Sequence, residues 1–403
     1  MSLHTPPLLR LAVLSDIHAY DPARHTDASR VPSKLPVPLG AVGPFENQFA
    51  GLRHLINEQA LKADILLCPG DLTCQADPIG LKYAWSELHA LKDRLGSSHL
   101  FATAGNHDLA SRGSPTVEEA KEFLGALRPM FPMDSKTHCS SYWAEHFATW
   151  SGCGINLVLL NSCPTHTLGN ADEFNRGRIT AASLIALQES VAALPPRPVN
   201  ILTCHHHPQS HAELSLGDED TMVHGQLLLD LLEQHGDWLV IHGHKHHPKI
   251  TYAAGGARSP IVFAAGSFAG NFGPAAETVA RNQFYILEIP TTLATPGIRG
   301  KVRAWNWAFG LGWVQSPYFT EGVSDQGGFG GRRHPERLAA EIQAYLTKHS
   351  KSFVGWITLC GDIAELAYLL PRDYEFLKRA LLKTFNLAIV EDGGRPAQVG
   401  RRP

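Results

Sequence analysis

The sequence predicts an α/β protein whose strands end in polar residues. Three observations lead to this class. Short apolar runs alternate with segments of helical apolar spacing, which is typical of a sheet covered by helices. Several of the apolar runs stop at aspartate, asparagine or histidine. The last of these runs leads into four histidines within residues 242–247.

Length and composition are those of a globular protein with more than one unit. The chain has 403 residues, of which 44% are hydrophobic and 18% are charged. We therefore expect one large domain, residues 1–320, followed by an appended segment. The net charge of −3 gives no overall attraction to nucleic acid or to an anionic membrane. Histidine, with 22 copies, is the exception in an otherwise ordinary composition.

Cysteine usage and the apolar stretches predict a cytoplasmic protein without a membrane span. The seven cysteines are odd in number and include no CxxC pair, which is typical of a reducing compartment. The N-terminal apolar run has neither the basic region nor the cleavage site of a signal peptide. The longest apolar stretch, residues 353–370, contains Asp362 and Glu365, which argues against a membrane helix.

The first buried strand is expected at residues 8–14, where Arg10 is the one polar interruption. It leads to Asp16 and His18, which would share one strand face and point to the same place. Such residues beyond a buried strand are frequent in the sites of open α/β sheets, although an ordinary polar loop is the alternative. Residues 19–45 are rich in proline and glycine, so they are expected to form a loop. The loop would either border the substrate or be a mobile segment without a role in the site.

The same arrangement follows a second strand. Residues 47–61 have the apolar spacing of a helix and lead to an apolar run at residues 65–68. This run stops at a glycine turn and Asp71. The pattern of a buried strand followed by an acidic residue thus occurs a second time. We therefore expect Asp71 at the same edge of the sheet as the residues after the first strand.

A third strand delivers the largest group of polar residues. Residues 80–95 predict an amphipathic helix, and residues 100–103 predict the next strand. After a glycine, this strand is followed by Asn106, His107 and Asp108. Three successive strand ends would therefore bring ligand-type side chains to one edge of a sheet.

The middle of the chain predicts two more helices and three more strands. The helices are expected at residues 116–127 and 181–194, and the strands at residues 141–147, 155–161 and 199–204. The last of these strands leads into three consecutive histidines, from His205 to His207. Arg176 and Arg178 lie just before a helix, where they would approach a phosphate, but a loop pair of this kind is more often solvated.

Residues 238–241 form the apolar run that ends in the histidine cluster. His244 and His246, two positions apart, would reach one site if the backbone there is extended. The alternative for the cluster is a histidine-rich turn on the surface. The strand-like runs that follow, at residues 260–265, 283–289 and 300–307, would complete a second sheet.

The character of the chain changes after residue 320. The glycine-rich residues 321–333 are expected to form a flexible linker. Residues 334–390 carry apolar residues at helical spacing and are expected to form a separate helical unit. The apolar faces of this unit would pack on the main domain or support oligomerisation. The tail at residues 391–403 is expected to be disordered.

The strand ends together supply a mixed set of oxygen and nitrogen donors. Carboxylates, a carboxamide and imidazoles are present without thiolate, which suits Mn, Fe or Zn. The set is too large for one tetrahedral ion and fits two ions that share a bridging carboxylate. Its members are Asp16, His18, Asp71, Asn106, His205 or His206, His244 and His246.

In their order and strand context, these motifs resemble the five motifs of the calcineurin-like metallophosphoesterases. The resemblance rests on Asp16-Ile-His18, Gly70-Asp71, Gly105-Asn106-His107-Asp108, the histidines before Pro208, and Gly243-His244-Lys245-His246. It spans about residues 8–310 and implies a four-layer α/β/β/α sandwich, here with an appended C-terminal helical segment. The resemblance does not cover that segment and does not explain the proline-rich loop.

The resemblance implies a dinuclear metal site with a role for each residue. The first ion would be held by Asp16, His18 and His246, the second by Asn106, His205 and His244, and Asp71 would bridge the two. His107 would contact the phosphate or protonate the leaving oxygen, and Asp108 would orient it. His242 and His247 fall outside the motif and are expected to be structural or solvated.

The fourth motif departs from the family's usual His-His-Pro-Pro pattern. Alignment without a gap makes His205 the metal ligand, and we prefer this alignment because the preceding strand then matches without a shift. Alignment on the final His-His-Pro triplet would choose His206 instead. In the preferred alignment, His206 lies close to the substrate.

The function implied by the resemblance is hydrolysis of a phosphoester by metal-activated water. Two ions would clamp the anionic oxygens and lower the pKa of a bound water toward about 7. The histidine-rich fourth motif resembles the cyclic-nucleotide phosphodiesterase branch, which makes a nucleotide diester the expected substrate. A DNA nuclease of the SbcD kind shares four of the motifs, but the near-neutral charge disfavours it. A non-catalytic protein-binding scaffold is disfavoured because no expected ligand position is empty.

Overall fold

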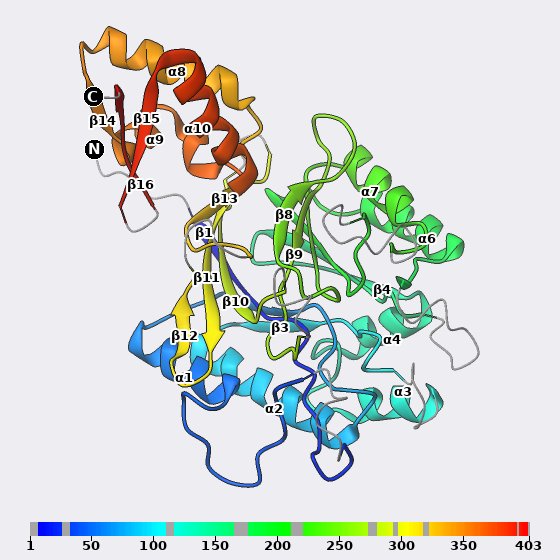
Figure 1. The fold of residues 1–403 in the computed structure, drawn as a ribbon. Coiled ribbons are helices and arrows are strands. Elements are labelled where there is room, and N and C mark those ends of the chain that lie inside the picture. Colours follow the sequence, from blue (N-terminus) through cyan, green and yellow to red (C-terminus); the bar gives the residue numbers. More distant parts are fainter. Residues whose placement is uncertain are drawn as a thin grey trace.

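Two large sheets face each other, with helices on their outer sides, and a smaller unit follows at the C-terminus (Figure 1). The computed structural model describes residues 7–25, 33–109, 117–164, 176–210, 221–272, 280–292, 297–316, 322–392 and 395–401. This architecture is the predicted four-layer α/β/β/α sandwich. No helix in these ranges is both long enough and apolar enough to cross a membrane.

The first sheet has the strand order β12-β11-β10-β1-β2-β3, with β13 beside β11. Its strands are β1 (Leu8–Val13), β2 (Ile65–Cys68), β3 (His99–Ala102), β10 (Gln283–Pro290), β11 (Gly300–Ala308), β12 (Gly312–Gln315) and β13 (Gly327–Phe329). The three strands β1, β2 and β3 are parallel, so their carboxyl ends meet at one edge. The expectation that β10 and β11 complete the second sheet is wrong, because β10 pairs antiparallel with β1.

The second sheet has the order β4-β5-β6-β7-β9-β8. Its strands are β4 (Phe147–Gly152), β5 (Ile155–Leu160), β6 (Val199–Thr203), β7 (Trp238–His242), β8 (Lys249–Tyr252) and β9 (Ile261–Ala264). Alternate residues of β5 enter different cores. Leu157 and Leu159 join the core between the sheets, whereas Val158 and Leu160 pack against the outer helices.

Helices cover the outer face of each sheet. The helices are α1 (Gln48–Glu58), α2 (Pro78–Leu95), α3 (Val117–Ala126), α4 (Lys136–Ala144), α6 (Ala181–Ala192) and α7 (Gly225–Gln234). α2 begins two residues before its predicted start because Asp77 caps it and Pro78 occupies its first position. It ends at Gly96, whose φ of 71° is left-handed.

The strand expected at residues 141–147 is wrong, because most of this segment belongs to α4. Tyr142 explains the difference. Its buried ring packs in the central core, and its hydroxyl lies 2.8 Å from the Thr103 hydroxyl and accepts from the Ala104 amide at 2.8 Å. Tertiary contacts of this kind override a local pattern of strand-forming residues.

The C-terminal unit contains strands as well as helices. It comprises α8 (Pro335–Lys348), β14 (Phe353–Gly355), α9 (Trp356–Asp362), the 3-10 helix η3 (Ala364–Tyr368), α10 (Pro371–Phe385), β15 (Leu387–Asp392) and β16 (Arg395–Arg401). The unit also has a hydrophobic core of its own, to which Leu338 of α8, Leu377 of α10 and Val399 of β16 contribute.

Two expectations for this region are therefore wrong. The tail expected to be disordered contains a paired strand, because β16 pairs with both β14 and β15. Residues 321–333 are not simply a flexible linker, because β13 pairs with β11 and buries Phe329 completely. Glycine and proline weaken the strand pattern of both segments, and pairing with strands that lie elsewhere in the sequence supplies the missing stabilisation.

Candidate metal centre

The predicted site residues come together from both sheets. Asp16 and His18 follow β1, Asp71 follows β2, and Asn106 to Asp108 follow β3 in the first sheet. The remaining histidines follow β6 and β7 of the second sheet. Every predicted histidine and aspartate ligand belongs to at least one group of three side chains whose ligand atoms lie within 4.8 Å of one another.

A left-handed backbone conformation directs many of these side chains into the site. The φ angles are 54° at Asp16, 51° at His18, 53° at Asp71, 78° at His244 and 55° at His246. The strand-like backbone expected at Asp16 and His18 is therefore wrong, and His244 and His246 reach the site without the extended backbone that was the condition for it. Each such angle costs a non-glycine residue about 1 kcal/mol or more, and strained residues of this kind gather at functional sites. Hydrogen bonds hold the turns in place, such as the one from the His244 amide to Asp16 Oδ1 at 3.0 Å.

One group of donor atoms surrounds Asp16. Its Oδ1 lies 3.2 Å from His246 Nε2 and 3.8 Å from His18 Nε2. The two imidazole Nε2 atoms are 3.2 Å apart, and His18 Nε2 lies 3.6 Å from Asp71 Oδ2. Asp16, His18 and Asp71 are buried. Two imidazole nitrogens and two carboxylate oxygens thus converge on one small volume.

A second group of donor atoms surrounds Asn106. Its Oδ1 lies 3.1 Å from His205 Nε2 and 3.1 Å from His244 Nδ1. His205 Nε2 is also 3.2 Å from Asp71 Oδ2. The same Asp71 oxygen therefore belongs to both groups.

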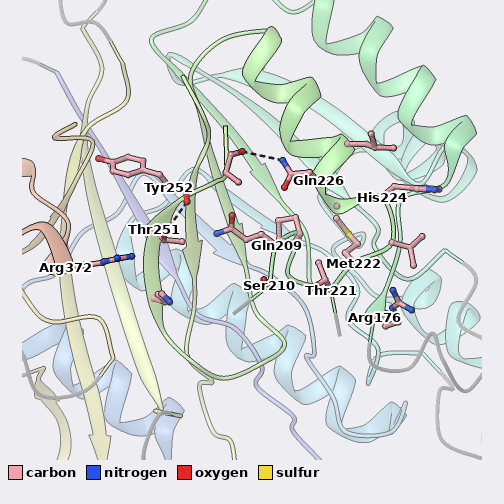
Figure 2. Close-up of a pocket in the computed structure, with 16 residues that line it drawn as sticks. Arg176, Gln209, Ser210, Thr221, Met222, His224, Gln226, Thr251, Tyr252 and Arg372 are labelled. Carbon is pink, nitrogen blue, oxygen red and sulfur yellow. Dashed lines mark hydrogen bonds between the residues drawn. The ribbon is translucent and has the colours of Figure 1, made fainter. Parts of the chain in front are cut away.

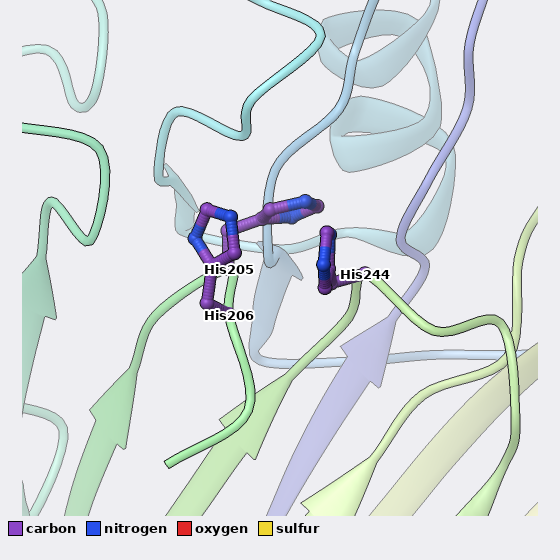
Figure 3. Close-up of side chains that lie close together, drawn as sticks. All are labelled: His205, His206 and His244. Carbon is purple, nitrogen blue, oxygen red and sulfur yellow. The ribbon is translucent and has the colours of Figure 1, made fainter. Parts of the chain in front are cut away.

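His205 and His206 have different partners, although both lie beside His244 (Figure 3). His205 Nδ1 is 2.9 Å from the Pro69 carbonyl. A carbonyl can only accept, so Nδ1 carries a proton and Nε2 is the nitrogen left to face Asp71. His206 Nδ1 instead lies 2.9 Å from the Ser162 hydroxyl. The geometry therefore favours His205 over His206 as the residue that faces the shared carboxylate.

Buried charge makes this site strongly polar. Burial alone would raise the pKa of Asp71, yet the nearby His205, His107 and His18 hold it well below its usual range. Burial lowers the pKa of His18 to about 3, which leaves its imidazole neutral. Burial also disfavours the charged form of His205, but the carboxylates of Asp71 and Asp16 outweigh this effect and raise its pKa to about 9. The two carboxylates thus attract positive charge into the site.

This donor set fits metal ions. Among the residues that the structure describes, no lysine or arginine forms a salt bridge with Asp16 or Asp71, so the buried carboxylates depend on histidine or on a bound cation for compensation. The Nδ1 atom of His18 is buried without a hydrogen-bond partner in this part of the chain. Ligands at about 2.0–2.2 Å from one ion lie roughly 3.0–3.5 Å from each other, and most of the contacts above fall in this range.

His107 and Asp108 occupy the loop after β3. The His107 amide donates to Asp71 Oδ1 at 2.8 Å, and its ring packs edge-on against His18, with ring centroids 4.7 Å apart. Both Asp108 oxygens accept from backbone amides, those of Thr73 and Gly105, each at 2.9 Å. Asp108 therefore ties this loop to the loop after β2. Through these two contacts it fixes the backbone of the loop that carries His107.

Two glycines allow the loops to approach this closely. A Cβ atom at Gly105 would lie 2.1 Å from Asp71 Oδ1. A Cβ atom at Gly70, whose φ is 100°, would lie 2.7 Å from His205 Nδ1. Any larger residue at either position would displace the carboxylate or the imidazole.

Ser162 also belongs to the site, although it was not predicted from the sequence, and the structure places two further histidines. The Ser162 hydroxyl accepts from the amides of His205 and His206, at 3.3 and 3.1 Å. It lies just beyond β5, so the strand-end pattern that found the other residues would have found it too. His242 and His247 are buried, which agrees with the structural alternative and excludes the solvated one.

Comparisons with known proteins agree with this geometry. A family model described as calcineurin-like phosphoesterase matches residues 9–248. A second model, described as wHTH-Calcineurin_assc, matches residues 327–383. This label denotes a winged helix-turn-helix, and we call the C-terminal unit of α8 to β16 the winged unit. A search of curated proteins finds no match.

Two solved structures share low similarity with the chain. A purple acid phosphatase from yellow lupin (Lupinus luteus) seeds is 13% identical, with 76% of this chain and 52% of that chain covered and a TM-score of 0.46. The chain thus spans about half the length of the lupin enzyme. A phosphopantetheinyl hydrolase from Mycobacterium tuberculosis is 12% identical, with 65% and 91% covered and a TM-score of 0.35.

Most of the sandwich, with its cluster of histidine, aspartate and asparagine side chains, lies within the residues that the calcineurin-like phosphoesterase model matches. The family model covers more than half of the chain. The chain belongs to the calcineurin-like phosphoesterase family, which implies a dinuclear metal centre.

Proposed function

We propose that the chain is a phosphodiesterase that holds two metal ions on either side of Asp71. One observation carries this proposal. Asp71 Oδ2 lies 3.2 Å from His205 Nε2 in one donor group and 3.6 Å from His18 Nε2 in the other. A carboxylate shared by two groups of ligand atoms is the arrangement that a pair of ions requires.

Each donor group supplies the ligands of one ion. In this proposal, Asp16, His18 and His246 hold the first ion, Asn106, His205 and His244 hold the second, and Asp71 bridges them. The donors are oxygen and imidazole nitrogen without thiolate, which suits Mn, Fe or Zn. Metals of this kind, when bound, neutralise the charge of a phosphodiester and activate water at neutral pH.

The protein's own residues position the reacting groups. His107 lies beside the first donor group, where its ring contacts His18 and its amide is fixed by Asp71. This position allows the imidazole to contact a phosphate oxygen and to protonate the leaving oxygen. Asp108 keeps the loop in place through its two backbone hydrogen bonds. His206 lies against His244, with ring centroids 4.4 Å apart, and so borders the substrate.

The preferred substrate is a nucleotide diester of the cyclic-nucleotide type. The histidine-rich sequence after β6 supports this choice, because it resembles that branch of the family. A DNA nuclease is the second candidate, and the winged unit favours it. Arg372, Arg379 and Lys383 are exposed along α10 of this unit, where they would attract a phosphate backbone.

An assay of three substrates with Mn²⁺ tests these functions. We expect cleavage of bis(p-nitrophenyl) phosphate, a diester, to exceed cleavage of the monoester p-nitrophenyl phosphate. A chelator should abolish the activity, and Mn²⁺ should restore it. Efficient cleavage of single-stranded DNA would favour the nuclease over the cyclic-nucleotide enzyme. Failure of the metal-loaded protein to cleave any of the three substrates would contradict the proposal.

A further inference from the structure

The peptide of Asp16 is held from two sides in its left-handed conformation. Its amide donates to the Gly70 carbonyl at 3.1 Å, and its carbonyl accepts from the Ser267 hydroxyl at 2.8 Å. The Phe268 amide lies 3.3 Å from the same carbonyl but only 2.7 Å from the Ser15 carbonyl, to which it donates more directly. The Ser267 hydroxyl is therefore the principal donor to the Asp16 carbonyl.

Ser267 itself has a fixed place in the fold. It is fully buried and lies three residues beyond the end of β9. Its carbonyl accepts from the Gln283 amide at 2.8 Å, and β-bridges join it to both Ser15 and Asn282. A Cβ atom at Gly270 would lie 2.8 Å from Ser267 Oγ, so there is little free space around the hydroxyl. The surroundings thus keep the hydroxyl directed at the Asp16 carbonyl.

A buried hydrogen-bond network supports the segment that carries Ser267. The Gln283 side chain donates to the Val323 carbonyl at 3.0 Å and accepts from the Val323 amide at 3.2 Å and from the Tyr285 hydroxyl at 2.9 Å. The Tyr285 hydroxyl in turn accepts from the Gly266 amide at 2.7 Å. Buried networks whose members are satisfied make a core rigid. The support for Ser267 therefore comes from the protein itself.

The conformation of the Asp16 peptide decides where its carboxylate lies. Asp16 Oδ1 lies 3.2 Å from His246 Nε2 and accepts from the His244 amide at 3.0 Å. A left-handed conformation is unfavourable for a residue other than glycine and persists only where its surroundings hold it. Without the bond from Ser267, the turn would relax and the carboxylate would move away from His246.

The cavity drawn in Figure 2 gives no comparable support to the metal centre. Its volume is about 650 Å³, and it is lined by Tyr252 of β8, His224 before α7 and Arg372 of α10, among others. None of its described lining residues belongs to either donor group. The side chain that bonds the Asp16 peptide comes instead from the segment after β9.

We propose that Ser267 is a positioning residue for the first ion, because its hydroxyl holds the Asp16 turn in the conformation that places the carboxylate beside His246. The inference rests on the proposed dinuclear centre and adds a residue to it. Loss of the hydroxyl should weaken the ion of the Asp16 group more than the ion of the Asn106 group. The reason is that Asn106 and His205 are carried by other loops, those after β3 and β6.

Metal binding by the variant Ser267→Ala tests this role. We expect the first ion to bind about tenfold more weakly than in the wild type, as is usual when a partner of a metal ligand is removed. Calorimetric titration with Mn²⁺ measures the two affinities, and anomalous diffraction at limiting Mn²⁺ shows which ion is lost. Unchanged affinities, or equal weakening of both ions, would overturn the proposal.

Ser97→Ala is the matched control. The Ser97 hydroxyl is also buried and also donates to a backbone carbonyl, that of Ala63 at 2.9 Å, but it lies at the end of α2, outside the metal centre. This variant loses the same kind of hydrogen bond and should bind both ions as the wild type does. Selective loss of the first ion in Ser267→Ala is therefore a result that a merely structural role would not give.

A measurement on the metal-free protein separates this inference from the dinuclear centre. If the wild type binds fewer than two ions, the dinuclear proposal fails. Hydrogen exchange of the His244 amide, followed by NMR, then still decides the role of Ser267, because this amide donates to Asp16 Oδ1. We expect exchange about tenfold faster in Ser267→Ala than in the wild type and Ser97→Ala. Equal rates in the three proteins would refute the positioning role.

Discussion

Replacement of Asp71 by alanine is expected to lower kcat/KM for a phosphodiester by about a thousandfold or more. Its Oδ2 atom belongs to both donor groups, at 3.2 Å from His205 Nε2 and 3.6 Å from His18 Nε2. Loss of the carboxylate removes the ligand shared by both ions and the acceptor for the His107 amide. A thousandfold loss corresponds to about 4 kcal/mol of transition-state stabilisation. Steady-state hydrolysis of bis(p-nitrophenyl) phosphate with Mn²⁺ measures this loss in kcat/KM.

Two further variants show whether charge at this position is the cause. Asp71→Asn keeps the size of the side chain and an acceptor for the His107 amide, but it removes the negative charge. We expect a loss close to that of the alanine variant. Asp93→Asn, at an exposed position in α2, should retain wild-type activity. Near-normal kcat/KM in Asp71→Asn would contradict a bridging role for the carboxylate.

Replacement of His205 by alanine is expected to lower the metal content from two ions per chain to one or none. Its Nε2 atom faces Asn106 and Asp71, and its Nδ1 atom is occupied by the Pro69 carbonyl. The neighbouring variant His206→Ala should keep both ions, because the proposed ligand position next to the bridging Asp71 belongs to His205, whose Nε2 lies 3.2 Å from Asp71 Oδ2. Elemental analysis of the two purified proteins measures the difference.

The two variants control for each other, since both remove a fully buried imidazole from the same loop. Thermal unfolding monitored by circular dichroism establishes that each protein folds. Two ions per chain in His205→Ala, together with loss of an ion in His206→Ala, would reverse the assignment of the fourth motif.

Much of the sandwich could be predicted from the sequence because its central strands are buried on both faces. The prediction for residues 65–68 matches β2 without error, and the predictions for residues 8–14 and 199–204 are each one residue too long. Local runs of apolar residues identify such strands. The strands β15 and β16 could not be found in this way, because β16 contains proline and glycine and depends on pairing with β14 and β15.

The residues that form the site could also be predicted from the sequence, whereas the backbone geometry that brings them together could not. A polar residue after a buried strand is visible in the sequence, and each motif followed such a strand. The left-handed turns at Asp16 and His244 are not visible, because non-glycine residues rarely adopt them without tertiary support. The same holds for Asp108, whose contacts with the Thr73 and Gly105 amides join two loops from different strands.

We propose above that this chain holds two metal ions on either side of Asp71. Anomalous diffraction from crystals of the Mn²⁺-loaded protein tests it most directly. We expect two peaks, one among Asp16, His18 and His246 and the other among Asn106, His205 and His244, with Asp71 between them. A single peak, or peaks away from Asp71, would contradict it.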